Sequence, residues 1–203
     1  MSSALSESLA ARVRSFEGDL YCHAPRDRPF DVEALARDDD GEDRWSTPGT
    51  STIYLAGDLL VATAEYARHG PRDGRDDQRR LVALGIRAVQ LLDVRDRGVQ
   101  AALGDADHPI AWLDVGRARE AARRIREAGI CDGLIVPSMA FIDREDVFNV
   151  VLFRESIDGP LGSALGEPHE VGRIELSAGN DDTEQGGRAG KRQAARTQPS
   201  PRE

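Results

Sequence analysis

The stretch DRWSTPGTSTIYLAGDLLVATAEYARH, residues 43–69, contains a turn, a strand and a helix in immediate succession. Residues 47–49 are typical of a tight turn, since proline presets one φ angle and glycine accepts a positive φ at the next position. The β-branched and aromatic side chains of 52–55 predict a short strand. Residues 57–58, Gly-Asp, predict a turn and a helix N-cap before an alanine-rich run. The segment therefore predicts a loop, a strand end and a helix that lie close together.

Each of these three pieces carries one chemically distinctive side chain. Arg44 lies at the mouth of the loop, and Tyr54 lies near the end of the strand. On the helix, Glu65 shares a face with Val61 and Ala62, which are four and three residues earlier. A carboxylate among small apolar residues is poorly placed for solvent. We interpret Arg44, Tyr54 and Glu65 as candidate site residues.

Each candidate also has an ordinary structural interpretation. Glu65 is spaced to pair with Arg68 or His69 on the surface of the same helix, and such pairs are common. Arg44 could be a turn arginine that stacks on Trp45. The tyrosine could simply belong to the core of a strand. The spacing alone does not choose between these interpretations and a functional site.

The segment resembles the RES domain family, which is named for an arginine, a glutamate and a serine. Its members have a G-x-x-R-W-[NS]-x-P-G turn, a T-[LI]-Y-L-A strand and a helix that ends A-E-[WYF]-x-R-H. The matching residues here are Gly41, Arg44, Trp45, Ser46, Pro48, Gly49, Thr52, Ile53, Tyr54, Leu55, Ala56, Ala64, Glu65, Tyr66, Arg68 and His69.

A second block extends the resemblance to roughly residues 20–153. Residues 133–143, GLIVPSMAFID, are similar to the family's G-x-x-V-P-S-x-A-F-x-D pattern, and 149–153, NVVLF, are similar to its N-[LV]-V-L-F strand. Ser138 is the family serine in this alignment. Two motifs in the expected order are far more specific than one short pattern.

The organisation of the chain predicts a mixed α/β (α+β) protein. Helical spacing within 3–16 indicates an N-terminal helix that occupies 1–19, followed by the RES domain over 20–158. A helix at 118–128 ends at a glycine suited to a C-cap, and apolar runs predict buried strands. Residues 159–203 are interpreted as a mostly disordered extension with room for one short strand at 171–176.

Composition narrows the class of partner. The 203 residues, 39% of them hydrophobic, suit one globular domain, and a net charge of −9 argues against a nucleic-acid partner held by phosphate contacts. No apolar run approaches a membrane span of roughly 18 residues, and the N-terminus lacks the order of a secretory signal, so we expect a cytoplasmic protein. Cys22 and Cys131 have no metal-ligand spacing and are expected to be free thiols. The acidic run 38–40 is interpreted as solvated loop, and no metal site is predicted.

The resemblance implies a fold and an activity. RES domains are similar to the ADP-ribosyltransferase fold, a mixed sheet core with flanking helices. Characterised members consume NAD⁺, and many are toxins neutralised by an Xre-like antitoxin. The expected reaction is cleavage at the nicotinamide-ribose bond, by a glycohydrolase, a phosphorylase or an ADP-ribosyltransferase. NAD is then a substrate, inorganic phosphate is a candidate co-substrate, no cofactor is required, and a homodimer is left open.

The resemblance also gives the candidate residues roles. Glu65 would stabilise the positive charge that develops on the ribose, as carboxylates do in glycoside hydrolysis. Arg44 would fork two hydrogen bonds to the pyrophosphate. Tyr54 would orient nicotinamide or ribose. Ser138 would bind substrate or position Glu65, since no His-Asp pattern makes it a nucleophile.

One position departs from the family. Members usually have an arginine in a [LVF]-[YF]-R-H pattern on the first strand, and Cys22 stands at that place within Leu20–His23. A thiol cannot replace a guanidinium charge. Three alternatives stay open: NAD⁺ is bound weakly, His23, Arg26 or Arg28 takes over the contact, or the chain is a degenerate, non-catalytic RES-fold protein that binds a nucleotide or a partner.

Overall fold

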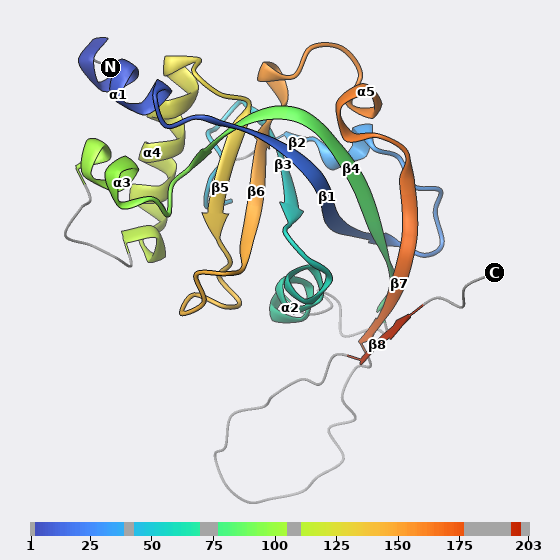
Figure 1. Cartoon of the computed structure of the whole chain (residues 1–203). Helices are drawn as coiled ribbons and strands as arrows, with labels where there is room; N and C mark the ends of the chain where they lie inside the picture. The colour runs from blue at the N-terminus through green and yellow to red at the C-terminus, as the bar shows by residue number, and fades with distance from the viewer. Residues whose placement is uncertain (1–2, 39–42, 70–76, 105–110, 177–195, 200–203) are drawn as a thin grey trace, which may run out of the picture.

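The computed structural model describes residues 3–38, 43–69, 77–104, 111–176 and 196–199, and Figure 1 shows their arrangement. Helices and strands alternate along the chain around one mixed sheet, which confirms the predicted fold class. The α-helices are α1 (Ser3–Ala10), α2 (Leu59–His69), α3 (Arg97–Leu103), α4 (Val115–Ala128) and α5 (Leu161–Leu165). Short 3-10 helices are η1 (Glu33–Leu35), η2 (Ala111–Leu113) and η3 (Arg154–Ser156). The strands are β1 (Arg14–Pro25), β2 (Arg37–Asp38), β3 (Ser51–Ala56), β4 (Asp77–Asp93), β5 (Gly133–Pro137), β6 (Phe148–Phe153), β7 (Pro168–Leu176) and β8 (Arg196–Pro199).

The sheet closes on itself. Its order is β1-β3-β6-β5-β4-β7-β8, with β2 added beside β3, and β1 also pairs with β4, so that β1, β3, β6, β5 and β4 form a ring. The long strand β4 makes this possible, because one of its edges pairs with β1 while the other pairs with β5 at one end and β7 at the other. Only β4 and β5 run parallel among these pairs. The ring leaves the ends of β5 and β6 next to α2 (Figure 1).

The interior of the ring is an apolar core. Alternate residues of each strand point inward, as the two-residue period of a strand requires, and α5 adds Leu161 and Leu165 to the same core. We call this cluster the ring interior. Its buried strand residues include Leu20, Cys22, Ile53, Leu55, Val82, Leu84, Ile86, Val150 and Leu152.

A second core lies between the other face of the sheet and α4. The predicted helix at 118–128 is confirmed as α4, whose N-cap Asp114 accepts a hydrogen bond from the backbone and whose C-cap Gly129 has a left-handed conformation at φ 59°. Its apolar stripe packs against Trp112 and Phe153. A third, small core beneath α2 includes Tyr66. The three cores fix the positions of both helices relative to the sheet.

Two predictions of extent differ from the structure. The N-terminal helix ends at Ala10, and 14–19 belong to β1, because these residues pair with the long β4 strand, with one irregularity of register between Phe16 and Gly18. At the other end, the expected short strand at 171–176 is present as β7 but begins at Pro168 and joins the same sheet. The sheet therefore continues past the boundary expected at 158. The predicted disordered stretch beyond 176 lies largely outside the described residues.

Both thiols lie in the interior. Cys22 and Cys131 are free and buried, which confirms the prediction from their spacing. Burial raises the pKa of each thiol to about 12. Within the described ranges, no helix combines the length and apolar character that a membrane span requires.

Candidate functional site

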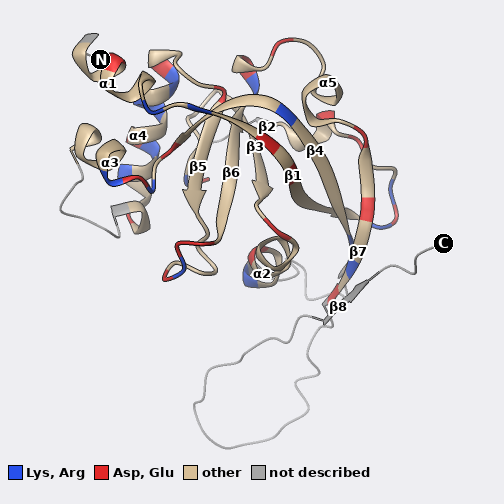
Figure 2. Ribbon diagram, viewed as in Figure 1, with Lys and Arg blue, Asp and Glu red and all other residues tan. Residues whose placement is uncertain are grey.

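Helix α2 carries Glu65 to the ends of β5 and β6. The helix begins as predicted, because the Asp58 carboxylate accepts a hydrogen bond from the Val61 amide at 2.7 Å. Val61 and Tyr66 are buried against the sheet. The side chain of Glu65 is 21% exposed, so its carboxylate lies at the boundary between protein and solvent. Figure 2 shows charged residues on α2 and on the neighbouring β5–β6 loop, beneath strands that are mostly uncharged.

Three donors converge on one oxygen of Glu65. Oε1 accepts from Ser138 Oγ at 2.7 Å, from Asn149 Nδ2 at 3.1 Å and from the Ala140 amide at 3.2 Å. The Ser138 hydroxyl, which is fully buried, also lies 3.3 Å from the Ala140 amide nitrogen. The structure therefore places Ser138 against Glu65, as one of its two predicted roles requires. A carboxylate held by three charge-assisted hydrogen bonds has a fixed orientation.

The other oxygen of Glu65 faces a cation. Oε2 lies 3.7 Å from Nη1 of Arg68, one turn later on the same helix. The interpretation of Glu65 as one partner of an ion pair within its own helix is therefore correct for Oε2 alone. Arg68 is 45% exposed, and exposed pairs contribute at most about 1 kcal/mol. Arg68 and Oε2 therefore form a charged, solvent-accessible surface, while Oε1 is held in place by its three donors.

Arg44 lies within electrostatic range of the same carboxylate. Its Nη1 donates to the carbonyl oxygens of Trp112 at 2.5 Å and Leu113 at 2.9 Å, which anchors the guanidinium on η2. Burial, followed by the positive charge of Arg68, lowers the pKa of Arg44, while Glu65 acts in the opposite direction. Arg68 therefore lies beside the carboxylate, and Arg44 adds a second positive charge in its vicinity.

Tyr54 supports the turn that carries Arg44. The phenolic oxygen accepts a hydrogen bond from the Trp45 amide at 3.1 Å and lies 3.0 Å from Ser46 Oγ. Ser46 is buried, so this contact is shielded from water. The hydroxyl that was expected to orient a substrate is instead bound to residues 45–46. Tyr54 is placed to control the position of the turn.

His23 and Cys22 point to opposite sides of β1. The His23 ring lies 4.5 Å from the ring of Tyr66, which places it against α2. Cys22 belongs to the ring interior, among Leu20, Leu55 and other apolar side chains. An arginine at position 22 of this backbone would enter that interior. The thiol itself lies on the opposite side of β1 from His23 and α2.

Sequence reasoning did not assign Asn149 to the site. The asparagine was part of a recognised pattern, but nothing in that pattern pointed to a hydrogen bond with a helix 84 residues earlier. The one available signal was a polar amide at the start of an apolar strand.

Among the described residues, no group of three or more histidine, cysteine, aspartate or glutamate side chains could hold a metal ion.

Comparison with known proteins agrees with this architecture. Residues 18–167 match the family model described as the RES domain. Among solved structures, a chain of the M. tuberculosis MbcT-MbcA toxin-antitoxin complex is similar, with a TM-score of 0.61 and 17% sequence identity, over 87% of this chain and 94% of that one. No curated protein sequence matches.

Proposed function

The chain belongs to the RES domain family, and we propose that it cleaves NAD⁺ at the bond between nicotinamide and ribose. The observation that supports this proposal most directly is the fixed carboxylate of Glu65, with three donors on Oε1. Departure of nicotinamide leaves positive charge on the ribose, as in glycoside hydrolysis. A carboxylate that is already oriented stabilises this charge without having to reorganise.

The two arginines suit the remainder of the substrate. Arg44 is anchored through Nη1, and the other nitrogens of its guanidinium have no partner among the described residues. A guanidinium presents a planar set of donors that matches phosphate oxygens. We propose that Arg44, with Arg68 nearby, binds the pyrophosphate, and that Tyr54 contributes by holding the turn. Water, inorganic phosphate or a protein side chain would accept the ADP-ribose.

The biological role proposed here is that of a toxin with a protein antitoxin. The MbcT-MbcA complex, which shares the fold, is a toxin-antitoxin pair by its description. An enzyme that consumes NAD⁺ is harmful to its own cell unless a partner restrains it. The alternative of a degenerate, non-catalytic protein rests on Cys22, whose thiol lies in the ring interior, and the experiment below distinguishes the two.

The test is release of free nicotinamide by the purified protein, with and without inorganic phosphate. We expect release by the wild type and a loss of at least about a hundredfold in Glu65→Gln, which removes the charge but keeps the size. Glu120→Gln is the matched control, because Glu120 is an exposed glutamate that pairs with Arg123 on α4. Equal release by wild type and Glu65→Gln would remove Glu65 from the mechanism. Binding of NAD⁺ without release would support the non-catalytic alternative.

A further inference from the structure

We propose that Arg95 is a positioning residue, which keeps the donors of Glu65 in place by bracing the β5–β6 loop against the end of β4. The inference rests on the proposed function, since it concerns the same carboxylate. Arg95 touches neither Glu65 nor any of its three donors in the contacts of the described residues. Its effect would pass through the loop that carries Ala140 and leads into Asn149.

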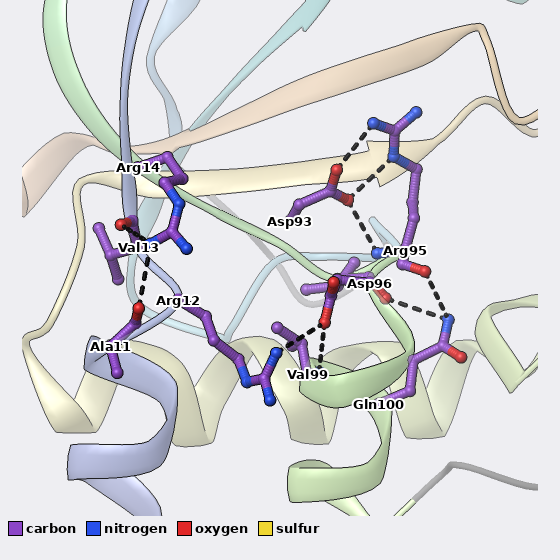
Figure 3. A network of polar contacts seen from close by, with 10 residues as sticks. Ala11, Arg12, Val13, Arg14, Asp93, Arg95, Asp96, Val99 and Gln100 are labelled. Atoms are coloured by element: carbon purple, nitrogen blue, oxygen red, sulfur yellow. Dashed lines mark hydrogen bonds and ion pairs between the residues drawn. The ribbon is translucent and has the colours of Figure 1, made fainter.

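The guanidinium of Arg95 is itself held rigidly. Asp93 accepts two parallel hydrogen bonds from it, from Nε to Oδ1 at 2.9 Å and from Nη2 to Oδ2 at 2.8 Å. The Arg95 amide adds a third bond to Oδ1, at 2.9 Å. Figure 3 shows this fork at the point where β4 ends. A bidentate pair of this kind fixes the plane of the guanidinium as well as its position.

The remaining nitrogen reaches across to the loop. Nη1 of Arg95 donates to the carbonyl oxygen of Glu145 at 3.0 Å. The guanidinium carbon also lies 5.2 Å from the centre of the Phe148 ring, within range of a cation-π contact. Glu145 and Phe148 stand between two of the donors to Glu65, Ala140 and Asn149. One arginine therefore contacts the loop on the stretch that joins these donors.

Phe148 connects the same brace to the start of α2. Its carbonyl oxygen accepts a hydrogen bond from the Gly57 amide at 2.9 Å. A Cβ at Gly57 would lie 2.9 Å from the Phe148 ring, so the turn before α2 is packed directly on this residue. Asp58, the next residue, caps the helix that carries Glu65. Arg95 thus supports both segments whose relative position sets the geometry of the carboxylate.

A second arginine in the same region provides a matched control. Arg12 forms an ion pair with Asp96 at 3.3 Å, close to Arg95 (Figure 3), and both partners are about half exposed. This pair lies at the start of α3 and makes no contact with the β5–β6 loop in the described residues. Removing Arg12 takes away one charge from the same neighbourhood without touching the brace.

The experiment compares Arg95→Ala, Arg95→Lys and Arg12→Ala in the full chain, with NAD⁺ as the probe. We expect Arg95→Ala to lower kcat for nicotinamide release by about ten- to a hundredfold with KM within about twofold, because a small displacement of a catalytic group is costly while binding is spared. Arg95→Lys should recover part of kcat, since its ammonium can still reach the Glu145 carbonyl. Low concentrations of methylguanidinium should also restore part of the activity of Arg95→Ala. Arg12→Ala should match the wild type.

A second readout separates this inference from the function itself. Hydrogen exchange of the amides in 138–147 should be faster in Arg95→Ala than in Arg12→Ala, whether or not the wild type releases nicotinamide. Unchanged exchange would overturn the proposed positioning role of Arg95 even in an active enzyme. A rise in KM at constant kcat would also overturn it, because Arg95 would then bind substrate. An inactive wild type with faster loop exchange in Arg95→Ala would refute the function but keep the brace.

Discussion

The ring interior and the Glu65 site use the same strands in different ways. In the interior, neighbouring strands contribute alternate apolar side chains, and each side chain is replaceable by another of similar size. At the ends of β5 and β6, single polar groups from separate segments meet on one oxygen atom. Cys22 illustrates the difference, because Tyr21 and His23 on either side of it face α2 while the thiol faces the interior. The face on which a residue lies, and not its closeness to a motif, decides whether it belongs to the site.

The largest expected effect comes from placing a charge in the interior. Cys22→Arg should destabilise the fold by about 4 kcal/mol or more, because a guanidinium there would be buried without a partner. Urea unfolding monitored by circular dichroism measures this change. Cys22→Val is the control and should stay within about 1.5 kcal/mol of the wild type. A stable Cys22→Arg protein that releases more nicotinamide would show that position 22 faces the site, and the comparison would fail.

The next effect concerns the hydroxyl that orients Glu65. Ser138→Ala removes the shortest of the three bonds to Oε1, so kcat should fall by about ten- to a hundredfold while KM changes little. Thr63→Ala is a matched control, since Thr63 is another buried hydroxyl, which donates to the Leu59 carbonyl within α2. The control should lose stability, by about 1 kcal/mol, but not kcat. If KM rose and kcat held in Ser138→Ala, the serine would be a binding residue.

A smaller effect is expected at the turn that carries Arg44. Tyr54→Phe removes the hydroxyl that holds residues 45–46 and should raise KM for NAD⁺ by about three- to tenfold, with a smaller change in kcat. Ser46→Ala, which removes the other side of the same contact, should act in the same direction. Steady-state kinetics of both variants is the measurement. A collapse of kcat at constant KM would indicate that the Tyr54 hydroxyl contacts the reacting ribose.

The smallest effect is the loss of stability that the two buried thiols cause at alkaline pH. Burial raises the pKa of Cys22 and Cys131 to about 12 from an ordinary value near 9, so the folded state keeps its protons where the unfolded state loses them. The contribution of each thiol to the free energy of unfolding is complete below about pH 9 and falls as the pH rises toward 12, by up to about 1.4 kcal/mol per pH unit. Unfolding of the wild type and Cys22→Ala at pH 8 and 10 measures it. If the free energy of unfolding changed equally between pH 8 and 10 in the two proteins, the buried position of Cys22 would be contradicted.

The sequence predicted the individual helices and strands better than the closure of the sheet into a ring. The β-branched and aromatic side chains of β3 and the C-cap glycine of α4 are local signals, and both elements lie close to where they were expected. The pairing of β1 with β4 was not predicted, because it depends on two strands that are far apart in the chain. This pairing also explains why 14–19 are strand although the apolar spacing of 3–16 suits a helix.

The site was predicted in part for the same reason. Glu65, Arg44 and Ser138 came from motifs, and the structure brings Ser138 into contact with Glu65 and Arg44 into its electrostatic range. The roles of Asn149 and Arg95 could not be predicted, because each acts through atoms contributed by a distant segment. A hydrogen bond between two such segments leaves no periodicity or spacing in the sequence.

Two donors to Glu65 follow it at a long distance in the sequence, and this affects when the site can form during synthesis of the protein. Ser138 and Asn149 follow the glutamate by 73 and 84 residues. At about 5 to 20 residues per second, a ribosome makes α2 several seconds before the groups that orient its carboxylate. A nascent chain therefore cannot assemble the site until most of it has been translated. Translation products that stop before β6 would lack the Asn149 donor, so the proposed activity would begin only after β6 has been made.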